Sequence, residues 1–221
     1  LTFAGFEPST TYYRYQDGHL MENFNTDSGG GYTYTQDISQ NHHVFIQENP
    51  STIGIHTNRT FTSDVYTDLF VGADNITIDG NGHTLQGPGT GWGFYLLRRR
   101  GVTIKNFVIK GWTHGMNMYY SEFNKFINNT LSNNWWSGAT LWLCHNNVFV
   151  NNTITNNGDR GLIMFYSGPN TLRNNTFAGN RFNFGSRGGE LEWLAHDVDT
   201  SNTVDGKPIY YLTNQSNIIV D

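Results

Sequence analysis

Three stretches of the chain repeat one pattern at a fixed interval. They read Asn128-Asn129-Thr130-Leu131-Ser132, Asn151-Asn152-Thr153-Ile154-Thr155 and Asn174-Asn175-Thr176-Phe177-Ala178, which gives the pattern a constant 23-residue period. Self-similarity at such an interval is typical of solenoids, in which each unit buries its apolar side against its neighbours. The sequence therefore predicts a stack of similar units.

The composition indicates that each unit is built from strands. The 221 residues include 28 Asn, 25 Gly and 25 Thr. Asn, Gly and Thr are poor helix formers, whereas Thr and the aromatic residues favour strands. One unit fits one coil of three short strands and three turns, with coils about 4.8 Å apart. We predict an all-β parallel β-helix over residues 41–221, preceded by a segment of residues 1–40 that caps the first coil or mediates assembly.

One set of asparagines is predicted to form a structural ladder. Asn106, Asn129, Asn152 and Asn175 share a column at the 23-residue spacing. Asn tolerates left-handed turns and bonds to nearby backbone. Stacked copies can also bond to one another, as they do in cross-β structures.

The residues after each repeated glycine separate an inner from an outer face. Alternation predicts three inward columns, and the third contains Tyr120, Leu143 and Tyr166. The same alternation points Tyr119, Trp142 and Phe165 outward as a flat aromatic stripe. Trp112 and Trp135 are predicted to stack near the preceding turn. The expected ligand-binding or interface residues are Trp112, Tyr119, Trp135, Trp142 and Phe165.

The sequence resembles right-handed parallel β-helix proteins of the NosD-like type, also called carbohydrate-binding and sugar-hydrolysing (CASH) domains. The resemblance rests on the stretch from Ala73 to Leu85, on the Asn-Asn-Thr coils and on the stretch from Asp205 to Tyr211. It covers the chain from about Val65 to Asp221. It implies a right-handed solenoid that serves as a polysaccharide lyase, hydrolase or epimerase, as an accessory factor for copper-site assembly, or as surface architecture.

Catalytic groups are sparse in the repeats. Glycoside hydrolysis requires paired carboxylates, yet residues 101–180 contain only Glu122 and Asp159, which fall at different turns. Glu190 and Glu192 could face one way in a strand, but a solvated loop is the favoured interpretation. Arg98–Arg100 with His83 would be a weak lyase or epimerase site. The prediction leans against an enzyme and names no catalytic residue.

No metal or cofactor is predicted either. The candidate copper ligands are His42-His43, Cys144-His145 and the methionines Met116, Met118 and Met164. The methionines occupy predicted core columns, where packing is their usual role. None of these residues has the spacing of a closed metal site.

Several features favour a protein outside the cell. The chain begins with Leu1, which fits removal of an export signal or a trimmed chain. Six glycosylation sequons occur, and those at Asn58, Asn75 and Asn214 are the credible ones, because stacked coils would crowd the others. The formal net charge of −5 disfavours nucleic acid, and no apolar run is long enough to span a membrane. We predict a secreted or cell-surface location.

The final strand suggests self-association. Ile218, Ile219 and Val220 echo the strand after Asn75, and an uncovered strand edge is a template for pairing. End-to-end contacts that do not close a ring grow filaments. The favoured function is therefore a structural, self-associating protein, with a homo-oligomer or polymer as the expected partner. The alternatives are a carbohydrate-binding module that binds polysaccharide and a polysaccharide-active enzyme.

Overall fold

The computed structural model describes residues 1–16, 19–36, 39, 41–42, 44–48 and 53–213. The chain divides into two compact units, Leu1–Thr52 and Ile53–Asp221, which are described separately. Within the described residues, no helix has the length and apolar character needed to cross a membrane.

The first unit consists of antiparallel strands around aromatic side chains. It contains β1 (Thr2–Phe3), β2 (Thr11–Gln16), β3 (His19–Asn25), β4 (Tyr32–Thr33) and β5 (Val44–Glu48). β2 lies between β3 and β5, and β1 pairs with β4. The rings of Phe24 and Tyr32 stack face to face. Because β5 pairs along most of β2, the unit extends past the predicted boundary at residue 40.

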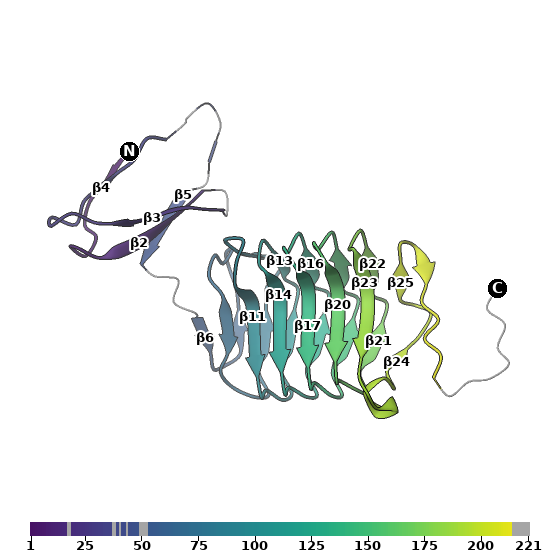
Figure 1. The fold of residues 1–221 in the computed structure, drawn as a ribbon. Helices are drawn as coiled ribbons and strands as arrows, with labels where there is room; N and C mark the ends of the chain where they lie inside the picture. Colours follow the sequence, from purple (N-terminus) through teal and green to yellow (C-terminus); the bar gives the residue numbers. More distant parts are fainter. Residues whose placement is uncertain (17–18, 37–38, 40, 43, 49–52, 214–221) are drawn as a thin grey trace. The chain divides into compact units, whose positions relative to one another are not determined.

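The second unit is a parallel β-helix made of three seven-stranded sheets (Figure 1). The sheet with the longest strands, called the long-strand sheet below, contains β6 (Ile53–Ile55), β8 (Leu69–Val71), β11 (Trp92–Leu97), β14 (His114–Tyr119), β17 (Ser137–Trp142), β20 (Arg160–Phe165) and β23 (Phe182–Arg187). Each strand pairs in parallel with the equivalent strand of the next coil, and equivalent positions in the central coils are separated by the same 23-residue interval. The predicted all-β solenoid with this period is confirmed.

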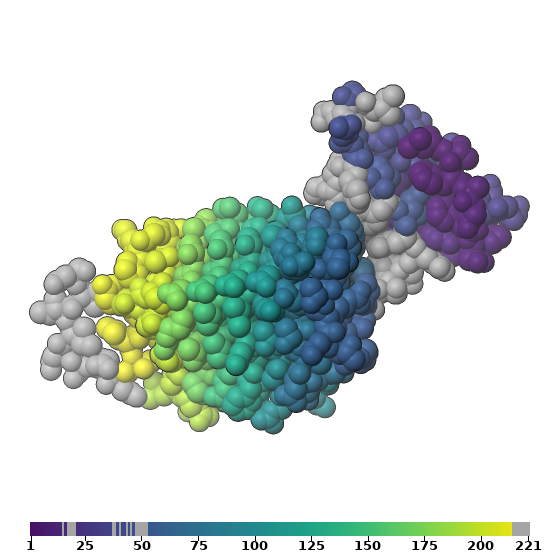
Figure 2. Space-filling model, turned by 180° about the vertical axis from the view of Figure 1, so that it is seen from behind, coloured from purple at the N-terminus to yellow at the C-terminus, as the bar shows by residue number. Residues whose placement is uncertain are grey.

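The other two sheets have shorter strands. The second contains β7 (Arg59–Thr60), β9 (Thr77–Asp79), β12 (Thr103–Lys105), β15 (Lys125–Ile127), β18 (Val148–Val150), β21 (Thr171–Arg173) and β24 (Asp197–Val198). The third contains β10 (Thr84–Gln86), β13 (Val108–Lys110), β16 (Thr130–Ser132), β19 (Thr153–Thr155), β22 (Thr176–Ala178), β25 (Thr203–Val204) and β26 (Lys207–Pro208), of which β26 alone runs antiparallel. A single turn of 3₁₀ helix, η1 (Leu191–Trp193), follows β23. Seen from behind, the coils of this unit follow one another in chain order (Figure 2).

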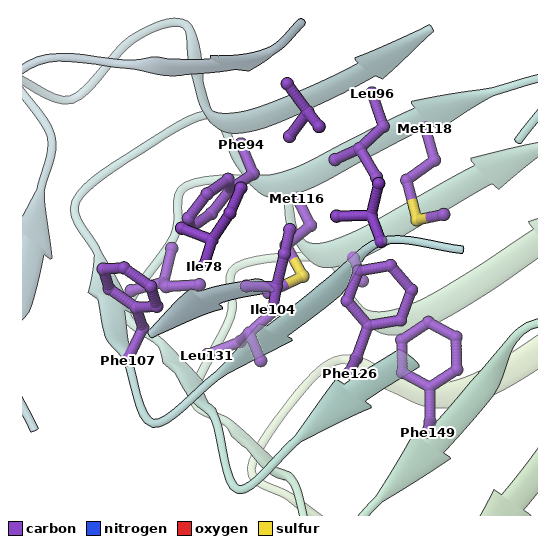
Figure 3. Packing of buried hydrophobic residues seen from close by; sticks show 14 of the residues in the cluster. Ile78, Phe94, Leu96, Ile104, Phe107, Met116, Met118, Phe126, Leu131 and Phe149 are labelled. Atoms are coloured by element: carbon purple, nitrogen blue, oxygen red, sulfur yellow. The ribbon is translucent and has the colours of Figure 1, made fainter. Parts of the chain in front are cut away.

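The interior of the coil is filled by apolar side chains from all three sheets (Figure 3). Met116 and Met118 are fully buried, as the alternation of β14 predicts. Stacking of equivalent positions also brings like residues together, and the rings of Phe126 and Phe149 stack with centroids 4.6 Å apart.

Buried asparagines connect the coils at three turns. In the first ladder, the amide nitrogen Nδ2 of Asn129 donates to Oδ1 of Asn152 at 3.2 Å, and Nδ2 of Asn152 donates to Asn175 at 2.9 Å. Each Oδ1 also accepts the backbone N–H of the preceding Asn. Two further ladders run parallel to it. One contains Asn124, Asn147 and Asn170, which also share the 23-residue spacing. The other contains Asn134, Asn157, Asn180 and Asn183 and was not predicted, nor was Asn202 at the end of the first ladder.

The predicted ladder is wrong at Asn106. One coil is a residue shorter than those that follow it, so Phe107 and not Asn106 lies 22 residues before Asn129 and donates its N–H to Asn129 Oδ1. Asn106 instead adopts a left-handed backbone with φ of 59°, as Asn128 does at the equivalent turn position. Its Nδ2 donates to Asp79 Oδ1 at 2.9 Å.

The third predicted core column is also wrong. Tyr120, Leu143 and Tyr166 lie just past the ends of β14, β17 and β20, and each has a positive φ. This left-handed residue ends the alternation, so the side chains of Tyr120 and Tyr166 are 52% and 36% exposed. The core of each long strand therefore ends at Met118, Leu141 and Met164.

The ladder generates a stability prediction. Replacing Asn152 with Leu leaves the N–H of Asn129 and the carbonyl of Phe126 without partners in a buried turn. Each such group costs about 1–3 kcal/mol, so we expect the free energy of unfolding to fall by at least about 2 kcal/mol. Chemical denaturation measures this change.

Asn151→Gly is the matched control. Asn151 is the exposed neighbour with φ of 56°, a conformation that glycine adopts freely. We expect its unfolding free energy to stay within about 0.5 kcal/mol of the wild-type value. Equal stability of the Asn152→Leu variant would show that the ladder contributes nothing.

Candidate functional site

Aromatic side chains gather on the outer face of the long-strand sheet. Trp142 and Phe165 occupy paired positions on β17 and β20, and their rings stack with centroids 4.2 Å apart. Tyr166 follows at 6.1 Å from Trp142, and Trp193 contacts Tyr166 edge to face at 5.4 Å. These four residues and Tyr119, which pairs with Trp142, are called the aromatic face below.

The predicted stripe is only partly exposed. Tyr119 and Trp142 are half-buried, as outward residues beside large neighbours would be. Phe165 points outward but is only 8% exposed, because Trp142 stacks over it. Its predicted exposure is therefore wrong, and Tyr166, which alternation assigned to the core, supplies accessible ring surface instead.

Trp112 and Trp135 do not stack as predicted. Trp112 is 2% exposed, and its indole Nε1 donates to the carbonyl of Leu85 at 3.1 Å. Because one coil is shorter, Trp112 is equivalent to Asn134. The Oδ1 of Asn134 accepts the backbone N–H of Trp112. Trp135, by contrast, is 73% exposed at the turn before β17. Trp112 therefore belongs to the core and Trp135 to the surface.

A second group of aromatic residues on this face was missed. Trp92 and Tyr95 of β11 stack with centroids 4.7 Å apart, and Tyr95 contacts Tyr119 at 6.2 Å. The sheet register pairs Tyr95 with Asn117, one position earlier than the period of the repeat implies, so a search at a fixed interval hides the relation. Permitting one coil to be a residue shorter would have revealed it.

Polar side chains lie at the centre of the same face. His114 Nδ1 is 2.8 Å from Ser137 Oγ and 3.2 Å from Thr140 Oγ1, and the two hydroxyls are 2.8 Å apart. Burial lowers the pKa of His114 to about 4, so its imidazole is neutral at pH 7. Ser137 is fully buried, so this Ser–His pair does not present a nucleophile to solvent. We refer to His114, Asn117, Ser137 and Thr140 as the polar cluster.

The carboxylates weighed for catalysis do not meet. Glu122 lies 3.5 Å from Arg100 at one end of the long strands. Asp159 lies 3.0 Å from Arg160 at the other end. Glu190 and Glu192 are exposed around η1 and not on a strand, as the favoured interpretation of a solvated loop expects.

The residues considered for a lyase, an epimerase or a metal site also lie apart from one another. His83 contacts Asp64 at 3.5 Å, next to β10, whereas Arg98 follows β11 and lies over the ring of Tyr120. Among the residues that the structure describes, no three His, Cys, Asp or Glu side chains are grouped to hold a metal ion. Cys144 is buried, which raises the pKa of its thiol to about 12.

The surface candidates have different surroundings. Asn58 and Asn75 are exposed, and Oδ1 of Asn58 accepts the Thr77 N–H at 2.8 Å. Asn214 and the predicted assembly edge, Ile218, Ile219 and Val220, lie outside the described residues.

Buried imidazoles predict a pH-dependent stability. Burial lowers the pKa of His196 to about 4, and its Nδ1 accepts the backbone N–H of Asn170 at the end of one ladder. The unfolded chain takes up this proton near pH 6.5, whereas the folded chain resists it until about pH 4. The free energy of unfolding should therefore fall by about 1–2 kcal/mol from His196 between pH 7 and 4.5.

His196→Asn tests this prediction by urea denaturation at both pH values. Asparagine ends the ladder at Asn202, so the replacement keeps an acceptor but does not titrate. We expect a flatter pH dependence than in the wild type. An identical slope in both proteins would contradict the assignment to His196.

A sequence profile and one solved structure relate the chain to known proteins. The search of curated proteins finds no match to the chain. Among solved structures, the enzymatically active domain of bacteriophage CBA120 tailspike protein 2 is similar, with a TM-score of 0.40 and 12% sequence identity. The similarity covers 56% of this chain and 18% of that chain. The sequence profile described as "Right handed beta helix region" matches residues 54–221, which is well over half of this chain. The chain therefore belongs to the right-handed β-helix family.

Proposed function

We propose that the chain binds polysaccharide through the aromatic face and carries out no reaction there. The observation that supports this most is the unbroken series of ring contacts from Phe165 through Trp142 and Tyr166 to Trp193. Trp142 and Tyr166 leave part of their ring surface to solvent. Aromatic rings offer a large, rigid apolar area, which suits the C–H faces of sugar rings.

The repeat of the solenoid favours an extended chain over a compact ligand. Tyr119, Trp142 and Phe165 lie on successive parallel strands, so their backbones are about 4.8 Å apart. This spacing is close to the advance of one sugar ring along an extended polysaccharide. A glycan that crosses the strands would therefore meet the accessible rings of Tyr119 and Trp142 on adjacent coils, with Phe165 supporting Trp142 from the next coil.

The resemblance to NosD-like and CASH domains supports the same ligand class. Those domains include carbohydrate binders and polysaccharide-active enzymes, and the two carboxylates within the repeats here are each paired with an arginine. We therefore favour binding over cleavage. The proposal also places the protein outside the cell, as a secreted or cell-surface protein.

Trp142→Ala tests the aromatic face. Affinity electrophoresis in gels that contain β-glucan, xylan, mannan, alginate or polygalacturonate first identifies the bound polysaccharide. We expect Trp142→Ala to weaken that binding about tenfold or more, which corresponds to about 1.4 kcal/mol. Far-UV circular dichroism should show that the variant is folded.

Trp135→Ala provides a control of the same residue type at the other end of β17. Because Trp135 is 73% exposed and lies outside the aromatic face, its loss should leave affinity within about threefold of the wild-type value. Equal weakening by both variants would indicate non-specific adsorption. No retention in any gel would contradict the proposed function.

Self-association is a second candidate function, and the open edge of the long-strand sheet favours it. Among the described strands, β23 pairs only with β20, so one edge of its six residues has no strand partner. An unpaired edge can accept a strand from another chain. A structural, filament-forming protein would use this edge, with Ile218, Ile219 and Val220 as additional candidates.

Sedimentation velocity over a wide range of concentration tests the second candidate. We expect larger species as concentration rises, and their loss when residues 215–221 are deleted or when Ile219 is replaced by Lys. A protein that remains monomeric throughout would eliminate self-association without affecting the polysaccharide proposal.

A further inference from the structure

Three residues that point away from the core are nevertheless buried. Asn117 alternates with the core residues Met116 and Met118 on β14, so its side chain lies on the outer face. It is only 2% exposed, and Ser137 and Thr140 are 0% and 1% exposed. The outer face therefore has its own buried layer beneath its larger side chains.

Within this layer the hydrogen bonds are unevenly distributed. His114, Ser137 and Thr140 bond to one another, so each has a partner. Oδ1 of Asn117 is buried and has no hydrogen-bond partner. A buried acceptor without a donor is destabilising, and such groups in folded proteins call for an explanation.

The position of Asn117 relates it to the aromatic face. In the register of the sheet it lies between Tyr95 on β11 and Thr140 on β17, two residues before Tyr119. Tyr95 and Tyr119 are half-buried and contact each other edge to face. For a ligand to reach Asn117, a neighbouring side chain must rotate, a motion that requires no change in the backbone.

We infer that Asn117 Oδ1 accepts a hydrogen bond from a hydroxyl group of an uncharged sugar residue in the bound polysaccharide. This inference rests on the function proposed above and names the ligand class of the same site. An acceptor oxygen can pair with a hydroxyl, whereas it repels the carboxylate of an acidic sugar.

The neighbouring outward positions agree with an uncharged ligand. Across β11, β14 and β17 they hold Trp92, Tyr95, Leu97, His114, Tyr119, Ser137, Thr140 and Trp142, none of which is an acid, a lysine or an arginine. The charges that border this set are Arg98 and Arg99, which follow Leu97 at the end of β11, and Arg160 on β20. Arg99 is paired with Asp74 and Arg160 with Asp159. His114 is neutral at pH 7 because burial lowers its pKa.

Asn117→Leu is tested by its melting temperature and by its affinity for polysaccharide. A merely structural role of Asn117 would lower both together. Leucine has a similar volume and removes the unpaired acceptor, so the melting temperature should stay the same or rise. Affinity for the most strongly retained of β-glucan, xylan and mannan should fall about tenfold. Asn152→Leu is the destabilised control: it lowers the melting temperature through the buried ladder, which lies between β18 and β19 and not on the long-strand sheet, so it should change affinity less than about threefold.

Other outcomes would overturn the inference in distinguishable ways. Unchanged affinity of Asn117→Leu, or a loss of affinity accompanied by a lower melting temperature, would assign Asn117 to structure alone. Binding of only alginate or polygalacturonate by the wild type would refute the uncharged ligand while sustaining the proposed function. If none of the five polysaccharides binds, the proposed function itself fails. If Asn117→Leu does not fold, Asn117→Ser replaces it, and the same tenfold loss is expected because the shorter side chain does not reach the sugar.

Discussion

Hydrogen bonding between buried asparagines is the interaction on which the β-helix depends. Each coil must turn three times, and each turn carries backbone groups into a region without water. The amide of Asn152 resolves this at one turn, because its Oδ1 accepts the Asn129 N–H and its Nδ2 donates to the carbonyl of Phe126. The amide also bonds to the next asparagine, so one residue type satisfies backbone and neighbour together. A long run of such bonds polarises its members cooperatively.

Most residues at the ends of the ladders differ from the asparagines between them. At the start of the three ladders, the side-chain oxygens of Asn124, Asn129 and Asn134 accept backbone N–H groups from the preceding coil, those of Val102, Phe107 and Trp112. At the last coil, His196 and Asn202 supply the acceptors for two of the ladders. Trp112 therefore joins a ladder through its backbone N–H, while its ring packs in the core.

This constraint explains how much could be predicted from the sequence. The solenoid, its period and the two inner columns of the long strands follow from spacing alone. A fixed interval misplaces Asn106 and Trp112, because it does not account for the one shorter coil. Alternation misplaces Tyr166, because a left-handed residue ends the strand one position earlier than the pattern implies. Asn202 is hidden by a 27-residue interval, since η1 and its flanking loop lengthen the last coil.

The candidate site lies where this constraint is weakest. Inward columns must repeat the same chemistry at every coil, because an unmatched group there would lack a partner or leave a cavity. Outward positions of the long-strand sheet carry no such requirement, and one register column changes from Tyr95 to Asn117, Thr140 and Ile163. A polar residue buried at such a position is not explained by stacking, since its neighbours in the column do not share its chemistry. Its unpaired oxygen is explained most simply by a partner that comes from outside the chain.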